Sequence, residues 1–148
     1  MSSGRLILSV ATALALSAGA TAVVAQSKER LPATVGDLTT AQLIEVRDQA
    51  GQVLLNGTFK TEKNKPDETE RKADLTSPTG QEKAEGDAEV EVERKNGVAK
   101  KDELELEVEH LPAMTSCEVF IDGVRAGAFV TSKSGKGKLK LDREFSGK

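Results

Sequence analysis

Residues 88–109 read AEVEVERKNGVAKKDELELEVE, and this stretch decides the fold. Apolar side chains alternate with glutamates on both sides of Asn96-Gly97, a dipeptide that favours a tight hairpin turn. Alternation with a period of two places one face of a strand in a core and the other face in water. The stretch therefore predicts two neighbouring antiparallel strands, each with one apolar face and one acidic face.

Strand and turn patterns continue on either side of this hairpin. Other runs rich in apolar and β-branched residues predict strands at 43–47, 52–59, 73–76, 116–121, 124–131 and 138–142. Turn residues predict reversals at 48–51, 77–80, 85–87 and Asp122-Gly123. A helix over 38–46, capped by Thr39 or Thr40, is the alternative for the first unit, but Gly51 and the β-branched residues favour strands. About eight short strands predict an all-β fold, either an antiparallel β-sandwich or a small barrel.

The chain divides into a leader and one domain. Residues 26–40 contain Pro32 and Gly36 and are expected to be an irregular lead-in. Residues 41–145 are expected to form the single β-sandwich domain. Within it, residues 60–72 carry alternating charge and no apolar side chain, which predicts a solvated, mobile loop.

Residues 1–25 have the features of a cleavable secretory signal peptide. Arg5 precedes an uncharged apolar run that extends to Ala25, and small residues at its end predict cleavage after Ala22 or Ala25. The run would just span a bilayer as an uncleaved anchor, but its many small residues favour cleavage. The sequence therefore predicts a secreted or periplasmic protein with no membrane span after signal cleavage.

Composition excludes several classes of function. The net charge of −3 and the absence of Trp and Tyr argue against a nucleic-acid partner and against an aromatic carbohydrate platform. One Cys cannot form an internal disulfide, and one His cannot build a multi-histidine metal site. We therefore expect neither a metal site nor any other cofactor.

A row of glutamates on the outward face is the candidate binding feature. Like charges opposite each other across a ladder cost a few tenths to about 1 kcal/mol per pair, so a basic neighbour is expected. The strand carrying Lys136, Lys138 and Lys140 is the candidate, with help from Lys100 and Lys101. The alternatives are a solvated face, a docking surface for a basic partner, and a calcium site, although no Asp-x-Asp-x-Asp loop is present. The residues concerned are Glu89, Glu91, Glu93, Glu103, Glu105, Glu107 and Glu109.

Other single residues point to structure more than to chemistry. His110 has no accompanying nucleophile motif, so a catalytic role is not expected. Cys117 is in phase with Val119 and Ile121, which predicts a buried thiol. The alternation also places Phe120 on the same face as Phe129, as part of a core or as an exposed interaction patch.

Four short segments resemble a recurrent pattern in uncharacterised exported bacterial β-sandwich proteins, and faintly resemble CHRD-type domains. The resemblance implies a secreted β-sandwich module. The histidine motif that often follows the Leu-Pro turn in CHRD domains is absent here, so no metal role is implied. The segments are Ala73-Asp74-Leu75, Gly86-Asp87-Ala88-Glu89-Val90, 106–112 (LEVEHLP) and Val119-Phe120-Ile121-Asp122-Gly123.

These observations favour an exported, non-catalytic module with a binding or structural role at the cell envelope or outside the cell. Its partner would be an unidentified protein or envelope component. The alternatives are a small carboxylate-based hydrolase, since acids are the only abundant catalytic side chains, and a calcium-stabilised surface module.

Overall fold

The computed structural model describes residues 25–80 and 83–143, which form one sheet of ten strands. Along the sheet the strand order is β10-β9-β3-β4-β6-β7-β8-β11-β2, and β5 pairs with the outer part of β6. The strands are β2 (Ala25–Arg30), β3 (Leu43–Asp48), β4 (Val53–Thr58), β5 (Lys60–Lys65), β6 (Glu68–Thr76), β7 (Glu85–Lys95), β8 (Val98–Glu109), β9 (Ser116–Ile121), β10 (Val124–Val130) and β11 (Gly137–Asp142).

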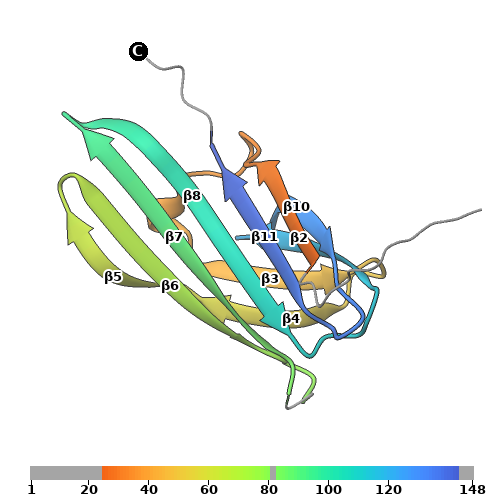
Figure 1. Ribbon diagram of the computed structural model, residues 1–148. Helices are drawn as coiled ribbons and strands as arrows, with labels where there is room; N and C mark the ends of the chain where they lie inside the picture. Colours follow the sequence, from red (N-terminus) through yellow and green to blue (C-terminus); the bar gives the residue numbers. More distant parts are fainter. Residues whose placement is uncertain (1–24, 81–82, 144–148) are drawn as a thin grey trace, which may run out of the picture.

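The sheet curls until its two ends meet, giving a nearly closed barrel (Figure 1). Strand β10 lies against β2 and β11, although no ladder pairing between β10 and β2 occurs in the described part of the chain. All neighbouring strands are antiparallel except β2 and β11, which are parallel. The predicted all-β fold is confirmed. The described residues form ten strands where about eight were expected.

Two segments that the sequence predicted to be irregular form regular structure. The lead-in, 26–40, contains most of β2 and a 3-10 helix, η2 (Leu38–Thr40). The charged segment 60–72, predicted as a mobile loop, forms β5 and half of β6 instead. Strand β6 pairs with β7 along its whole length, and its side chains alternate between water and the interior. Arg71 is its one charged side chain that faces the interior. The predicted turn at 85–87 is the start of β7.

The interior is apolar over most of the barrel. Strands β7 and β8 bury one face, as their alternation predicts. The two-residue turns at Asn96-Gly97 and Asp122-Gly123 are also confirmed, and both have positive φ angles at both central residues, as a type I′ turn requires. The largest fully buried side chains are Leu38, Ile44, Leu55, Leu75, Leu104, Leu106, Leu139, Leu141, Val35, Val46, Val90 and Val108.

A bulge in β10 separates the two phenylalanines that the alternation placed together. The register of β10 against β9 shifts between Arg125 and Gly127, which brings Phe129 opposite Cys117 and turns it inward. Phe120 remains outward, where the guanidinium of Arg47 lies 4.0 Å from its ring centre. The expected shared phenylalanine face is therefore wrong, because the bulge adds one residue to the alternation.

One end of the barrel is polar inside. The guanidinium of Arg71 is buried and donates hydrogen bonds to the carbonyl oxygens of Leu38, Ala41 and Phe59. Its Nε also donates to Thr61 Oγ1 at 3.2 Å. Arg71 therefore attaches the η2 segment and the start of β5 to the barrel wall.

A second, partly buried ion pair lies at the same end of the barrel. The carboxylate of Asp102 accepts a hydrogen bond from Arg143 Nε at 2.8 Å, and Arg143 Nη2 donates to the carbonyl oxygens of Val35 and Gly36. Burial raises the pKa of Asp102, while Arg143 opposes that rise. The pair ties the segment before η2 to β8 and to the end of β11.

The sheet turns a corner between β4 and β6. These strands share a single ladder pair, Asn56 with Thr76 at the end of β6, whereas the first half of β6 pairs with β5. At this point the backbone of Gly57 is so close to Asp74 that a Cβ atom on Gly57 would clash with the Asp74 carbonyl. A glycine is therefore required where the two strands cross.

Most of the predicted signal peptide lies outside the described residues. Its last residue, Ala25, is the first residue of β2. Among the residues that the structure describes, no helix is long and apolar enough to cross a membrane.

Candidate functional site

The outward side chains of β6, β7, β8 and β11 form a strongly charged surface, which we name the acidic face. Strands β7 and β8 are neighbours, as predicted, and their register places acids directly opposite each other. All of the glutamates singled out from the sequence lie on this outward side. The opposed pairs are Glu85–Glu109, Asp87–Glu107, Glu89–Glu105 and Glu91–Glu103.

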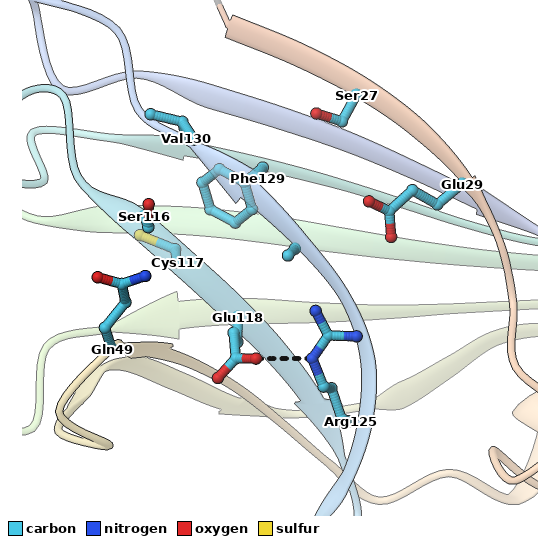
Figure 2. A pocket seen from close by; sticks show the side chains of 10 residues that line it. Ser27, Glu29, Gln49, Ser116, Cys117, Glu118, Arg125, Phe129 and Val130 are labelled. Atoms are coloured by element: carbon cyan, nitrogen blue, oxygen red, sulfur yellow. Dashed lines mark hydrogen bonds and ion pairs between the residues drawn. The ribbon is translucent and has the colours of Figure 1, made fainter.

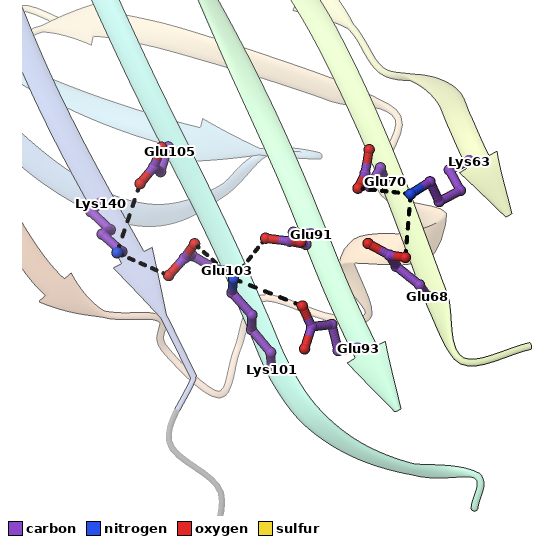
Figure 3. Close-up of polar contacts among 9 residues, drawn as sticks. All are labelled: Lys63, Glu68, Glu70, Glu91, Glu93, Lys101, Glu103, Glu105 and Lys140. Carbon is purple, nitrogen blue, oxygen red and sulfur yellow. Dashed lines mark hydrogen bonds and ion pairs between the residues drawn. The ribbon is translucent and has the colours of Figure 1, made fainter. Parts of the chain in front are cut away.

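Lysines neutralise the half of the acidic face nearest the Asn96-Gly97 turn (Figure 3). Lys101 Nζ lies 2.7 Å from Glu91 and 3.7 Å from Glu103, and the hydrogen bond to Glu91 is the main cause of its raised pKa. Lys140 Nζ lies 3.1 Å from Glu103 and 3.7 Å from Glu105. The predicted compensation by the neighbouring basic strand is therefore present, because β11 pairs with β8.

The other end of the acidic face has less of this compensation. Acids from three strands surround a hollow of about 260 Å³, which we name the acidic pocket. Only Glu107 among them has an ion pair within the described chain, with Lys138 at 3.3 Å. Burial raises the pKa of Asp87, and the charges of Glu107 and Glu89 raise it further. The lining residues are Asp74, Glu85, Gly86, Asp87, Glu107 and Glu109.

His110 lies beside the acidic pocket. Its ring and the carboxylates of Glu85 and Glu109 offer ligand atoms that all lie within 4.8 Å of one another. The sequence reasoning named Glu107 and Glu109 but missed the other three acids of the pocket. The register of β7 on β8 is the signal that identifies two of them, since it sets Glu85 and Asp87 opposite named glutamates.

We expect the repulsion around Asp87 to appear as a pH dependence of stability. A carboxyl whose pKa is higher in the folded state binds more protons when folded, so stability falls as the pH rises from the unfolded pKa through the folded one. Asp87→Asn removes this loss. Thermal melts between about pH 3 and pH 7 are expected to show the midpoint of the variant gaining on that of the wild type as the pH rises.

Asp67→Asn is the matched control for this experiment. Asp67 is an exposed residue in the turn between β5 and β6, outside the acidic pocket. The melting midpoint of Asp67→Asn should follow that of the wild type across the pH range. An Asp87→Asn curve parallel to the wild type at every pH would contradict the repulsion.

A larger and less charged hollow of about 760 Å³ lies at the junction of β2, β9 and β10 (Figure 2). Arg125 Nε donates to Glu118 at 2.6 Å on one side of it, and Glu29 of β2 faces it from the other side. Burial raises the pKa of the Cys117 thiol to about 11, so this group is protonated near neutral pH and is a poor nucleophile. The lining residues are Ser27, Glu29, Gln49, Ser116, Cys117, Glu118, Arg125, Ala128, Phe129 and Val130.

This junction does not leave room for an added strand. Residues of β10 and β2 approach within 8 Å between Cα atoms, whereas a strand inserted between two others needs about 9–10 Å between them. The free edge of β5 is rich in lysine and glutamate, which discourages strand addition there. Among the surfaces described, the acidic face is therefore the one whose chemistry best specifies a partner.

Comparison with known proteins adds no relative to this description. The chain matches no protein-family model, no curated protein and no solved structure. The function is therefore inferred from the residues and their arrangement.

Proposed function

We propose that the protein is exported and that its mature domain is a non-catalytic binding module, which docks a basic peptide segment of a partner on the acidic face. The observation that carries the proposal is the acidic pocket, where the carboxylates of Asp74, Glu85, Asp87 and Glu109 form no ion pair within 4.0 Å among the described residues, although the charge of Lys72 acts on Asp87 from farther away. The predicted signal peptide and the resemblance to exported β-sandwich proteins support a location at the cell envelope or outside the cell.

The spacing of the carboxylates suits a row of lysine or arginine side chains. Outward residues on one strand recur every second position, about 7 Å apart, and the next strand lies about 5 Å away. Calcium, in contrast, requires six to eight oxygens at about 2.3–2.6 Å. The two groups of acidic or imidazole ligands that gather among the described residues have three members each, Glu85, Glu109 and His110 in one and Glu68, Glu91 and Glu93 in the other. The carboxylates of the second group are already paired with Lys63 or Lys101. A basic peptide therefore fits the acidic face better than a calcium ion does.

Exposure of the acids favours attraction of cations over acid–base catalysis. Asp74, Glu85, Asp87, Glu107 and Glu109 are all exposed on the outside of the sheet. A hydrolase needs a pair of carboxyls in a cleft that holds the substrate and restricts water. This contrast supports the binding role over the hydrolase alternative.

Binding of a fluorescent oligolysine peptide tests the docking proposal. We expect saturable binding at about 20 mM salt that weakens strongly at about 150 mM, because exposed charges are screened. The triple variant Asp74→Asn, Glu85→Gln, Asp87→Asn should bind about tenfold more weakly, since three exposed ion pairs contribute about 0.5 kcal/mol each. Fluorescence anisotropy measures both effects.

A second triple variant removes the same charge elsewhere. Glu29→Gln, Glu62→Gln and Asp67→Asn lie outside the acidic face and should leave the affinity within about twofold of the wild type after correction for net charge. Equal losses in the two triple variants would show that only the net charge matters and would refute docking on the acidic face. Calcium that raises the melting temperature of the wild type, with no binding of the peptide, would favour the calcium-stabilised alternative.

Export is tested separately from docking. The protein recovered from the periplasm or the medium should begin after Ala22 or Ala25, as read by N-terminal sequencing. A cell-associated protein that retains residues 1–25 would contradict cleavage.

A further inference from the structure

The polar end of the barrel contains a pocket that lies far along β7 and β8 from the acidic pocket. Helix η2 lies against β6 and β7 at this end, and the β5–β6 hairpin extends beside it (Figure 1). Between them is a hollow of about 400 Å³. The residues that line it are Thr39, Thr61, Asn64, Lys65, Pro66, Thr69 and Arg94.

The lining of this pocket is polar and basic, in contrast to the acidic face. The lining includes two cations, Lys65 and Arg94, together with three threonine hydroxyls and one side-chain amide. None of the lining residues is acidic. The carboxylate of Asp37 is bonded to Thr39, on the η2 side of the pocket. Mouths of β-barrels with a few converging polar groups are frequent ligand sites, and pockets for small ligands occupy about 300–1,000 Å³.

Within the described chain, neither cation is held in a close ion pair, although Asp37 and Asp102 attract Arg94 at longer range. Neither Arg94 nor Lys65 has a carboxylate within 4.0 Å among the described residues. The guanidinium of Arg94 makes one long contact, from Nη1 to Thr69 Oγ1 at 3.4 Å. Its remaining N–H groups are therefore available to donate to a ligand.

The surrounding groups are held in place by the fold. Thr69 is 5% exposed, and its hydroxyl lies 3.5 Å from Asn64 Oδ1. Thr61 Oγ1 accepts a hydrogen bond from buried Arg71, which leaves the hydroxyl hydrogen of Thr61 to donate. The backbone N–H of Arg94 donates to the Asp67 carbonyl at 2.8 Å, which attaches β7 to the β5–β6 turn. The Thr61 hydroxyl is therefore a fixed donor that binds a ligand with little ordering cost, whereas the hydroxyls of Thr39 and Thr69 already donate to Asp37 and Asn64 and can accept from a ligand.

We propose that this pocket binds the oxyanion of a small hydroxylated molecule, a phosphate or sulfate ester of a sugar-like compound. Arginine and lysine supply charge-assisted hydrogen bonds to the oxyanion, which are stronger than neutral ones. The threonine hydroxyls and the Asn64 amide pair with hydroxyl groups on the body of the ligand. The pocket, at about 400 Å³, is larger than an inorganic phosphate or sulfate ion and leaves room for the hydroxylated part of the ligand.

Titration of the mature protein with inorganic phosphate, inorganic sulfate, glucose 6-phosphate and glucose tests this inference at constant ionic strength. Amide chemical shifts in NMR spectra report both affinity and location. We expect saturable shifts at residues 61–69 and at Arg94, with glucose 6-phosphate binding more tightly than either inorganic ion and glucose alone binding least. The ratio between phosphate and sulfate identifies which ester the pocket prefers.

Three variants decide whether these residues form the site. Arg94→Gln and Lys65→Gln should each weaken glucose 6-phosphate binding by about tenfold, because each removes a charge-assisted hydrogen bond. Lys95→Gln makes the same charge change at an exposed neighbour that does not line the pocket, and should bind as the wild type does.

Exposed Lys65 keeps the test decisive if Arg94→Gln fails to fold. Absence of saturable shifts with every anion, shifts elsewhere in the barrel, or equal weakening in Lys65→Gln and Lys95→Gln would overturn the inference. Oligolysine binding to the acidic face is a separate measurement, so either proposal can fail without the other.

Discussion

Arg71→Met is expected to lower the free energy of unfolding by about 3–5 kcal/mol and the melting temperature by about 10 °C or more. Methionine fills much of the space of the arginine stem but donates no hydrogen bond. The carbonyl oxygens of Leu38, Ala41 and Phe59 then lose a buried donor, at about 1–3 kcal/mol for each group left unsatisfied. Urea denaturation followed by circular dichroism measures the change.

Lys72→Met is the matched control for Arg71→Met. Lys72 is the next residue of β6 and points outward, where it forms an ion pair with exposed Glu89 at 3.4 Å. Exposed ion pairs contribute about 0–1 kcal/mol, so the control should remain within about 1 kcal/mol of the wild type. Similar losses in the two variants would show that Arg71 is not the attachment of the η2 segment to the barrel.

Strand β6 shows why part of the fold could not be predicted from the sequence. Residues 60–72 contain charged and polar side chains on both faces of the strands, so they lack the apolar alternation that identifies β7 and β8. Thr69 and Arg71 nevertheless face the interior. A buried arginine is stable only if carbonyl groups from distant segments accept its hydrogen bonds, and local sequence does not contain that information.

The pairing of β7 with β8, in contrast, follows from the sequence. A two-residue turn at Asn96-Gly97 sets Lys95 opposite Val98. Continued without interruption, that register would place Glu89 opposite Leu104, and one strand would then expose apolar groups on the acidic face. The structure resolves the conflict with a bulge between Glu93 and Arg94. Turn and alternation together therefore specify the bulge and the opposed acids.

Only part of the candidate site could be predicted, because only some of its strands show clear alternation in the sequence. The glutamates of β7 and β8 and the compensating lysines of β11 belong to strands with clear alternation. Asp74 reaches the acidic pocket from β6, and the polar pocket at the other end depends on the β5–β6 hairpin. The hairpin belongs largely to residues 60–72, which lack an apolar period, whereas Asp74 lies in the predicted strand 73–76, whose pairing with β7 the sequence does not specify.

Gly57→Ala is expected to lower the free energy of unfolding by about 2–3 kcal/mol, because a Cβ atom there would clash with the Asp74 carbonyl and lie 3.4 Å from Leu75 Cα. These are backbone atoms, which cannot move without shifting β6. Gly36→Ala is the control, since Gly36 has no positive φ angle and nothing lies within 4 Å of its Cβ position, and it should change stability by less than about 0.5 kcal/mol. Urea denaturation compares the two variants.

Equal stability of these two variants would contradict the close crossing of β4 and β6. The crossing matters for function because the carbonyl that Gly57 approaches belongs to Asp74, whose side chain lines the acidic pocket. A Gly57→Ala protein that still folds must displace β6 at this point and carry Asp74 with it. Oligolysine should then bind it more weakly than it binds Gly36→Ala, even where both are fully folded. The corner of the sheet would thus determine where the acidic pocket forms.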